Sequence, residues 1–319
     1  MSEAGGFVLA LSGGIGGAKL ALGLYRVLPP GALTVVANTG DDFAHLGLAV
    51  SPDLDTLLYT LAGIDNPVAG WGRRDETWTF MAALERLGGD TWFRLGDGDL
   101  ATHVERTRRL AAGDSLAQIT DDFRRRLGIS ARLLPMSDDP VRTRLSTAEG
   151  WLDFQEYFVR RQCAPIIREI AFAGASAARA HPDFLAALAD RALRMVVVCP
   201  SNPLISIDPI LSLPGVREAL RACPAPVVAV SPLIGGKAVK GPSAKMMAEL
   251  GLTVGAAAVA SHYRDFLDHY FVDDADADAM AGFDLPVTAT RTLMETLADR
   301  EALAQVVLAA AKGFAARGF

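Results

Sequence analysis

Residues 7–37 read FVLALSGGIGGAKLALGLYRVLPPGALTVVA, and this stretch decides the fold. An apolar run, Phe7–Leu11, ends at a glycine-rich turn, after which Ala18–Val27 carries apolar side chains at helical spacing. A second apolar run, Leu33–Ala37, follows a turn rich in proline and glycine. Strand, turn, helix and strand in this order predict a right-handed βαβ unit with two parallel, buried strands.

The turn after the second strand is acidic. Residues 38–56 read NTGDDFAHLGLAVSPDLDT and bring together four carboxylates, Asp41, Asp42, Asp53 and Asp55. Such a cluster is unfavourable unless cations, backbone N–H groups or solvent compensate its charge. Oxygen ligands without a cysteine or histidine cluster favour Mg²⁺ over Zn²⁺. We predict Asp41 as the first metal ligand because it directly follows the strand, whereas helix capping is an alternative role for Asp53.

The parallel pattern returns in the second half of the chain. Met195–Cys199 and Pro226–Val230 are short β-branched runs separated by a helical segment, and each leads into a proline-bearing turn. Between the two halves, residues 65–180 combine helices with a predicted hairpin. We therefore predict an α/β fold with a Rossmann-like, mostly parallel sheet flanked by helices. Residues 1–64 and 181–319 would form this nucleotide-binding core, and 65–180 a mixed helical and hairpin insertion.

The composition narrows the class of protein. Half of the 319 residues are hydrophobic, yet no apolar run approaches the ~18 residues of a membrane span. The N-terminus has no basic segment followed by an apolar core, which favours the cytoplasm over secretion. A formal net charge of −6 opposes nucleic-acid binding, so we expect neither a nucleic-acid nor a membrane partner. The three cysteines lack paired spacing and predict neither a disulfide framework nor a zinc site.

The glycine turn is placed to bind a phosphate, because backbone N–H groups and a helix N-terminus meet there. Gly13, Gly14, Gly16 and Gly17 would permit a close approach. Their spacing does not satisfy the G-x-G-x-x-G pattern of dinucleotide-binding proteins. A tight turn without a ligand is therefore the alternative.

Two further regions carry binding chemistry. Trp71 and Trp78 flank charged residues, a mixture that could hold a planar polar ring, with core packing as the alternative. The turns that contain Ser201, Asn202 and Ser231 place small polar groups at predicted strand ends. That chemistry fits a nucleotide base and its phosphates.

With these motifs assembled, the chain resembles the 2-phospho-L-lactate transferase family of coenzyme F420 biosynthesis. The matching segments, in order, are Gly13–Lys19, Asn38–Asp42, Pro52–Thr56, Gly70–Gly72, Glu76–Trp78, Gly96–His103, Phe154–Tyr157, Pro200–Pro203 and Ser231–Pro232. A lone glycine turn is weak evidence, whereas this ordered set is specific.

The resemblance implies Mg²⁺-dependent transfer of a phospho-acid from a guanosine diphospho-acid to the ribityl hydroxyl of the deazaflavin Fo, with release of GMP. The transferred group would be phospholactyl, phosphoenolpyruvyl or phosphoglyceryl. Catalytic roles would fall to Asp41, Asp42 and Asp55, with Asp41 and Asp55 on the metal. The implied binding residues are Gly13, Gly14, Gly16, Gly17, Asn38, Ser201, Asn202 and Ser231, and, near Fo, Trp71, Glu76, Thr77 and His103.

Two other interpretations compete with a transferase. A non-catalytic nucleotide-binding or nucleotide-sugar-binding regulator similar to the gluconeogenesis-factor family would share the glycine and acidic turns. That family continues into Gly-Gly-Ser-Ser, where this chain has Phe43-Ala44-His45. A nicotinamide dehydrogenase would need the complete glycine pattern and no carboxylates at the pyrophosphate. The long helix predicted over Leu297–Ala316 would suit a homodimer, and no residue indicates which phospho-acid is transferred.

Overall fold

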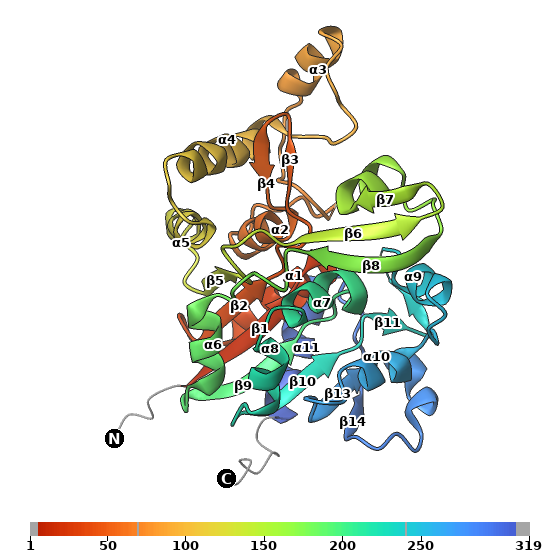
Figure 1. Ribbon diagram of the computed structural model, residues 1–319. Helices are drawn as coiled ribbons and strands as arrows, with labels where there is room; N and C mark the ends of the chain where they lie inside the picture. The colour runs from red at the N-terminus through yellow and green to blue at the C-terminus, as the bar shows by residue number, and fades with distance from the viewer. Residues whose placement is uncertain (1–5, 69, 240, 311–319) are drawn as a thin grey trace.

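The structure is a computed structural model that describes residues 6–68, 70–239 and 241–310. A seven-stranded sheet in which every pairing is parallel lies at its centre (Figure 1). Its strands are β1 (Phe7–Ser12), β2 (Leu33–Ala37), β5 (Arg132–Pro135), β9 (Leu193–Val198), β10 (Val227–Val230), β13 (His269–Val272) and β14 (Val287–Ala289). Across the sheet the order is β5-β2-β1-β9-β10-β13-β14. This is the strand order of a doubly wound dinucleotide-binding sheet with one strand added, which confirms the predicted Rossmann-like fold.

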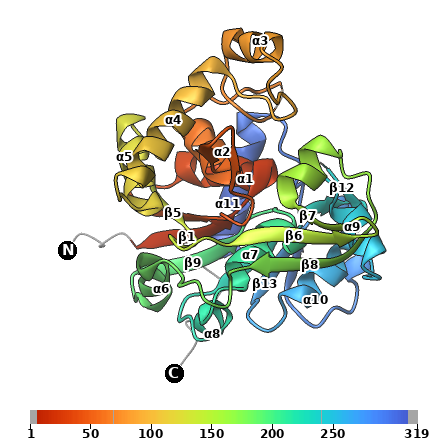
Figure 2. The same ribbon diagram turned by 45° about the horizontal axis from the view of Figure 1, so that its top comes forward.

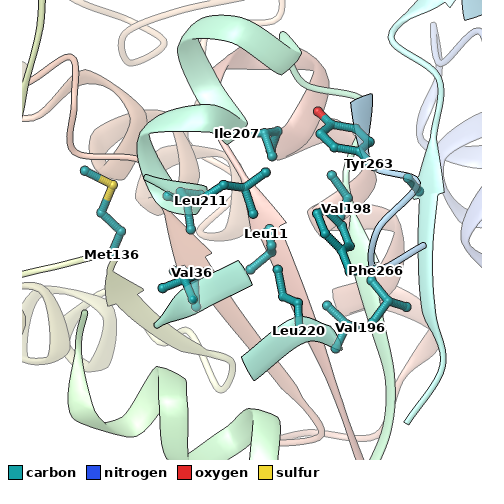
Figure 3. Close-up of a cluster of buried hydrophobic side chains, with 14 of the residues drawn as sticks. Leu11, Val36, Met136, Val196, Val198, Ile207, Leu211, Leu220, Tyr263 and Phe266 are labelled. Atoms are coloured by element: carbon teal, nitrogen blue, oxygen red, sulfur yellow. The ribbon is translucent and has the colours of Figure 1, made fainter. Parts of the chain in front are cut away.

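Helices cover both faces of the sheet, as expected for buried parallel strands. Leu9 and Leu11 of β1 pack into one core, and Val8 and Ala10, which alternate with them, pack into the other. The first core (Figure 3) includes residues of α6 (Pro182–Ala189), α7 (Asp208–Leu211), α8 (Val216–Arg221) and α10 (Ala256–His262). The second includes residues of α1 (Gly14–Val27), α2 (Pro52–Leu61) and α11 (Leu297–Ala310).

Two helices differ from the sequence-based expectation. α1 begins at Gly14 rather than at Ala18, so Gly14, Gly16 and Gly17 belong to the helix itself. α11 packs against α1 and buries Leu303, Ala304 and Val307. The apolar side chains that α11 buries therefore pack within the same chain, whereas Leu297 is exposed, and the rest of that predicted helix lies outside the described residues.

The segment predicted as an insertion contains helices and a small sheet. Figures 1 and 2 show α3 (Thr79–Arg86) and α4 (Asp97–Ala111) on one side of α2 and the small sheet on the other. The hairpin is confirmed as β6 (Arg142–Thr147) and β7 (Gly150–Asp153), and an unpredicted strand, β8 (Ile167–Ala173), joins it. The predicted boundaries of the insertion are wrong for one strand. β5 lies within residues 65–180 but pairs with β2 in the main sheet.

Short elements complete the described chain. They are β3 (Phe43–His45), β4 (Leu48–Val50), α5 (Leu116–Arg126), β11 (Leu233–Ile234), β12 (Lys237–Ala238) and α9 (Ser243–Glu249), with π turns at Glu156–Arg160 and Pro203–Ile207 and 3₁₀ turns at Asp274–Asp276 and Asp278–Met280. β3 and β4 form a hairpin that extends the acidic turn. Among the described helices, none has the length and apolar character that crossing a membrane requires.

Candidate active site

The topology of the sheet places the site. From β1 the chain continues to β2 on one side, whereas the other neighbour of β1, β9, continues to β10 on the opposite side. Ligands of doubly wound proteins bind at this switch point, beyond the carboxyl ends of the strands. A cavity of about 690 Å³ is lined there by the turns that follow β1, β2, β9 and β10. The predicted residues that line it are Gly13, Gly14, Gly16, Asp41, Asp55, Trp71, His103, Ser201, Asn202 and Ser231.

The last two glycines of the turn serve close packing. A Cβ atom on Gly16 would lie 2.4 Å from the carbonyl oxygen of Pro200. One on Gly17 would lie 2.4 Å from the hydroxyl oxygens of Ser12 and Ser201. A larger residue at either position would push α1 away from the turn after β9. Gly17 is not part of the described cavity lining, so packing, rather than the predicted nucleotide contact, accounts for it.

Asp53 joins the glycine turn to the end of β2. Its carboxylate accepts hydrogen bonds from the backbone N–H of Gly14 at 2.7 Å and from the side-chain amide of Asn38 at 2.9 Å. The capping alternative is therefore wrong, because Asp53 binds groups outside its own helix and α2 has no side-chain cap. Asn38 is buried behind Asp53 and orients it, and it does not belong to the described lining.

Asp41 and Asp42 are buried carboxylates with few partners. The Oδ1 atom of each has no hydrogen-bond partner among the described residues. Burial, followed by the neighbouring charge of Asp53, raises the pKa of Asp41 well above its ordinary value. Burial also raises the pKa of Asp42 to about 7, against the opposing charge of Arg142. Because Asp41 lines the cavity, a cation bound there would relieve this unfavourable burial of charge, and the residues present fit a metal ion.

Asp42 lies outside the described lining, and its pKa predicts a pH effect on stability. In the folded protein its carboxyl holds a proton up to about pH 7, whereas 3.8 is its ordinary pKa. The folded state therefore binds more protons between these two values, and this group makes the free energy of unfolding fall as pH rises. The Asp42→Asn variant is expected to gain stability over the wild type progressively across this window. Thermal melts of the metal-free proteins at several pH values would measure it, and a gain independent of pH would contradict the prediction.

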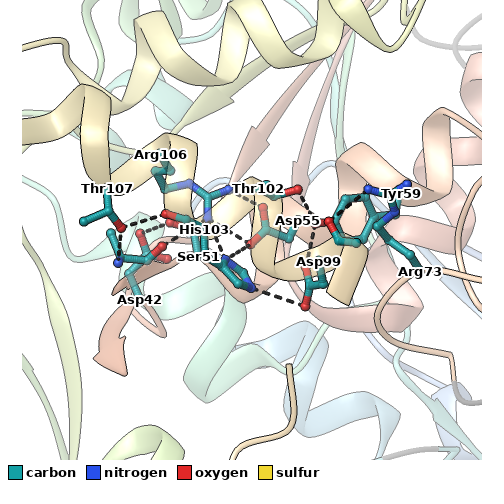
Figure 4. Close-up of polar contacts among 12 residues, drawn as sticks. Asp42, Ser51, Asp55, Tyr59, Arg73, Asp99, Thr102, His103, Arg106 and Thr107 are labelled. Carbon is teal, nitrogen blue, oxygen red and sulfur yellow. Dashed lines mark hydrogen bonds and ion pairs between the residues drawn. The ribbon is translucent and has the colours of Figure 1, made fainter. Parts of the chain in front are cut away.

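A second group of charged side chains joins α2 to α4 (Figure 4). Arg106 is buried and forms a two-pronged ion pair with Asp55, with Nη1 3.1 Å from Oδ2 and Nη2 on Oδ1. Nη1 of Arg106 also lies 3.3 Å from Nδ1 of His103, whose Nε2 lies 3.2 Å from Asp99. The hydroxyl of Tyr59 donates to Asp99 at 2.6 Å. By distance alone, Asp55, Asp99 and His103 could hold a metal ion, since their ligand atoms lie within 4.8 Å of one another.

Sequence reasoning did not single out Tyr59 and Arg106, and it included Asp99 only as part of the matching segment Gly96–His103. A signal exists, because Asp99, His103 and Arg106 follow the spacing i, i+4 and i+7, which places polar groups on one face of α4. Asp55 and Tyr59 are likewise four residues apart on α2. Only the packing of these two faces against each other shows that the groups form one site.

Glu76 and Thr77 hold the junction of α3 and α4. The carboxylate of Glu76 accepts hydrogen bonds from the backbone N–H groups of Gly98 at 2.6 Å and Asp99 at 2.8 Å. The hydroxyl of Thr77 donates to Asp97 at 2.5 Å, and Asp97 in turn accepts from the first turn of α3. Glu76 thus caps α4, and Thr77 supports the carboxylate of Asp97, which caps α3. Neither Glu76 nor Thr77 belongs to the described lining, so the predicted contact with Fo has no support at these positions.

Aromatic side chains form part of the cavity lining. They are Tyr59, Trp71, Trp92, Phe93, Phe154 and Phe158. Phe93 packs edge-to-face on Phe43 with ring centroids 4.8 Å apart, and Trp92 packs on His45 at 5.3 Å. Trp78 lies outside the described lining, under the guanidinium of Arg94 at 4.1 Å. Trp71, rather than the Trp71–Trp78 pair, is the predicted tryptophan that faces the cavity.

Comparison with known proteins identifies the family of this chain. A family model described as 2-phospho-L-lactate transferase CofD matches residues 8–306. The chain is 44% identical over 306 residues to a phosphoenolpyruvate transferase of Kitasatospora aureofaciens, with 94% of this chain and 95% of that protein covered. It is 40% identical over 306 residues to a 2-phospho-L-lactate transferase of Methanosarcina mazei, with 95% and 100% covered.

A solved structure shares the fold at low sequence identity. The protein BH3568 of Bacillus halodurans, described as a member of the UPF0052 family, matches with a TM-score of 0.62 and 14% identity over 95% of this chain and 98% of that one. A likeness at this identity shows the fold alone and does not distinguish a transferase from the regulator alternative. The family match and the relatives at 40% identity or more decide between them: this chain belongs to the 2-phospho-L-lactate transferase CofD family and transfers a phospho-acid in coenzyme F420 biosynthesis.

Proposed function

We propose that the protein transfers a phospho-acid from a guanosine diphospho-acid to a ribityl hydroxyl of the deazaflavin Fo and releases GMP. The hydroxyl oxygen forms a bond to the phosphorus that carries the acid, and the bond from that phosphorus to the bridging oxygen breaks. GMP leaves with the bridging oxygen, and the hydroxyl proton passes to water. The observation that carries the proposal is one cavity that joins Asp41, the turns at the switch point and an aromatic wall. Oδ1 of Asp41 has no hydrogen-bond partner among the described residues. A donor and an acceptor can therefore meet beside Asp41.

The side of the cavity at the switch point suits the nucleotide. Ile15 and Gly16 line the cavity at the start of α1, where the helix end carries partial positive charge. The hydroxyl of Ser201 accepts from the backbone N–H of Gly13 at 3.2 Å, which fixes the turn after β9 against the glycine turn. Lys19 also lines the cavity, and its Nζ donates to the carbonyl of Met294 at 2.6 Å. These groups would hold the diphosphate and position its reacting phosphorus.

We propose Mg²⁺ as the metal ion and Asp41 as its ligand from the protein. The described residues gather no group of three ligand atoms around Asp41. Mg²⁺ commonly takes one or two carboxylates and completes its shell with substrate phosphates and water, so this sparse site fits it. When bound, the ion would neutralise charge on the diphosphate. Asp55, the second predicted ligand, has both oxygens on Arg106, so we place it outside the metal shell.

Sparse protein ligation predicts that Mg²⁺ binding depends on the donor. Without a donor, Asp41 offers few ligands and Mg²⁺ is expected to bind weakly, in the millimolar range. With a guanosine diphospho-acid, phosphate oxygens complete the shell, and the affinity for Mg²⁺ is expected to rise at least tenfold. Isothermal titration calorimetry with and without the donor measures both values. Equal affinities in the two titrations would contradict the proposed site.

The aromatic part of the lining suits the planar ring of Fo. Trp71, Trp92 and Phe93 offer faces and edges against which a tricyclic ring can pack. Trp92 and Phe93 are themselves held by contacts with His45 and Phe43, so their orientation is fixed before binding. We therefore propose that the ring lies against these residues.

The reaction is tested with purified protein, Mg²⁺, Fo and each of three donors. The donors are guanosine diphosphate esters of lactate, enolpyruvate and glycerate. GMP and a more anionic deazaflavin are the expected products with at least one donor, as measured by liquid chromatography and mass spectrometry. Absence of both products with all three donors would contradict the proposed function, and the donor with the highest kcat/KM identifies the acid.

We also propose the cytoplasm as the location. Cys163, Cys199 and Cys223 are all free thiols, and Cys199 and Cys223 are buried. Free thiols are typical of a reducing compartment. Fractionation of the native host with an antibody against the protein tests this directly.

A further inference from the structure

Asp99 is held by two donors at the wall of the cavity. Tyr59 Oη lies 2.6 Å from Asp99 Oδ1 and 2.9 Å from the hydroxyl of Thr102. An ionised carboxylate only accepts, so the single proton of Tyr59 goes to Asp99, and Tyr59 accepts from Thr102. Oδ2 of Asp99 faces Nε2 of His103 at 3.2 Å. The backbone N–H of Asp99 is fixed in addition by Glu76.

Arg106 decides which nitrogen of His103 carries the proton. A guanidinium donates and never accepts, so Nδ1 of His103, 3.3 Å from Nη1 of Arg106, must act as the acceptor. The neutral imidazole then carries its proton on Nε2, which points at Asp99. Nδ1 is then occupied by Arg106, and Nε2 carries the proton, so neither nitrogen offers a lone pair to a metal ion or to a substrate proton. His103 is therefore a positioning residue.

The carboxylate of Asp99 retains capacity for substrate. Two carboxylate oxygens can accept about four hydrogen bonds, and among the described side chains Tyr59 donates one of them, while Nε2 of His103 lies 3.2 Å from Oδ2. Asp99 is partly exposed and lines the cavity, together with Asp55 and Tyr59. Trp71 and Trp92 line the same cavity. A flat ring against the tryptophans would therefore place its chain of hydroxyl groups in the cavity that Asp99 lines.

We propose that Asp99 binds hydroxyl groups of the polyhydroxylated chain of the acceptor, and that Tyr59, His103 and Arg106 hold this carboxylate in place. The inference rests on the proposed function, because it takes the acceptor to be Fo. The inference adds that the Asp99 carboxylate distinguishes an acceptor with a ribityl chain from one that carries the same ring on a plain alkyl chain. A site that pairs a partly buried carboxylate with substrate hydroxyls rejects an analogue that lacks them, since the analogue displaces water from the carboxylate without replacing its hydrogen bonds.

The test compares two acceptors on three proteins by isothermal titration calorimetry. The acceptors are Fo and a deazaflavin whose chain keeps the terminal hydroxyl and lacks the internal ones. The proteins are the wild type, Asp99→Asn and, as a control on the same helix, Glu105→Gln, whose side chain is exposed and pairs with Arg108. The wild type and Glu105→Gln are expected to bind Fo about tenfold or more tightly than the analogue. Asp99→Asn is expected to bind the two acceptors with nearly equal affinity.

The outcomes separate this inference from the proposed function. An Asp99→Asn variant that still prefers Fo as strongly as the wild type does would overturn the inference and leave the transferase untouched. A wild type that binds neither acceptor would overturn both. If Asp99→Asn fails to fold, as judged by circular dichroism, Tyr59→Phe is used instead. Its preference for Fo is expected to fall, and an undiminished preference would again overturn the inference.

The orientation of His103 has its own readout. Two-bond ¹H–¹⁵N correlation spectra distinguish the protonated from the unprotonated ring nitrogen. The wild type is expected to carry the proton on Nε2 at neutral pH. A proton on Nδ1 would show that Arg106 does not set the tautomer, and it would remove His103 from the support of Asp99.

Discussion

Replacement of Asp41 by asparagine is expected to lower turnover about a thousandfold and, in the absence of metal, to raise the melting temperature. The loss of turnover follows because an amide holds Mg²⁺ far less well than a carboxylate. A bound metal ion contributes several kcal/mol to stabilising the transition state, and ~4 kcal/mol corresponds to about a thousandfold. Steady-state kinetics with saturating donor measure this part.

The gain in stability has a different physical cause, which is the burial of the Asp41 carboxyl in the metal-free protein. Asp41 is 6% exposed, and burial and the charge of Asp53 raise its pKa, so at neutral pH its carboxyl is an unfavourable group in the metal-free fold. An amide removes that cost, and a gain of about 1 kcal/mol would raise the melting temperature by ~2–4 °C. Added Mg²⁺ and donor should stabilise the wild type more than the variant, which keeps the nucleotide contacts and lacks the proposed metal ligand.

A matched control isolates the role of Asp41. Asp274 is exposed on a 3₁₀ turn, so Asp274→Asn is expected to keep both turnover and melting temperature. Fo should bind Asp41→Asn nearly as well as it binds the wild type, because the aromatic lining is unchanged. Turnover at the wild-type rate in Asp41→Asn would remove Asp41 from the mechanism. A lower melting temperature without metal would show that its carboxylate is compensated in the fold.

The main sheet could be predicted from sequence because its information is local. The predicted ends of β1 and β2 lie within one residue of the observed ones, since short apolar runs bounded by glycine and proline define these strands. The strand pattern alone also brings Asp41 and Ser201 to one edge, because parallel strands place their carboxyl ends together. The prediction wrongly places β5 in the insertion because its pairing is not local. β5 pairs with β2, and the paired residues lie about a hundred positions apart in the sequence.

The polar wall of the site could not be predicted in the same way. Asp99 and Arg106 resemble the solvated charges of any surface helix, and α4 contains many such residues. Their role appears only when α4 packs against α2 and buries them beside Asp55 and Tyr59. Glu76 was instead predicted as a binding residue because it lies close in sequence to Trp71 and Trp78. In the structure its carboxylate caps α4.

Replacement of Arg106 by methionine is expected to destabilise the protein by about 3–5 kcal/mol, because it leaves the carboxylate of Asp55 buried without its partner. The two side chains are almost fully buried, and Arg106 engages both oxygens of Asp55. Arg108→Met is the control on the same helix. Its side chain is 65% exposed and pairs with Glu105, so its replacement is expected to leave the free energy of unfolding almost unchanged. Denaturant unfolding of both variants measures the difference.

A double variant shows whether the cost arises from unpaired charge or from lost packing. Asp55→Asn alone leaves Arg106 without its strongest partner and is also expected to destabilise the fold. If unpaired charge dominates, Arg106→Met with Asp55→Asn should be more stable than the sum of the single losses predicts, by about 1–3 kcal/mol. Additive losses would show that Arg106 acts mainly by filling space between α2 and α4. Coupling would instead show that the charge of the ion pair contributes to holding α4, and with it Asp99, against the cavity.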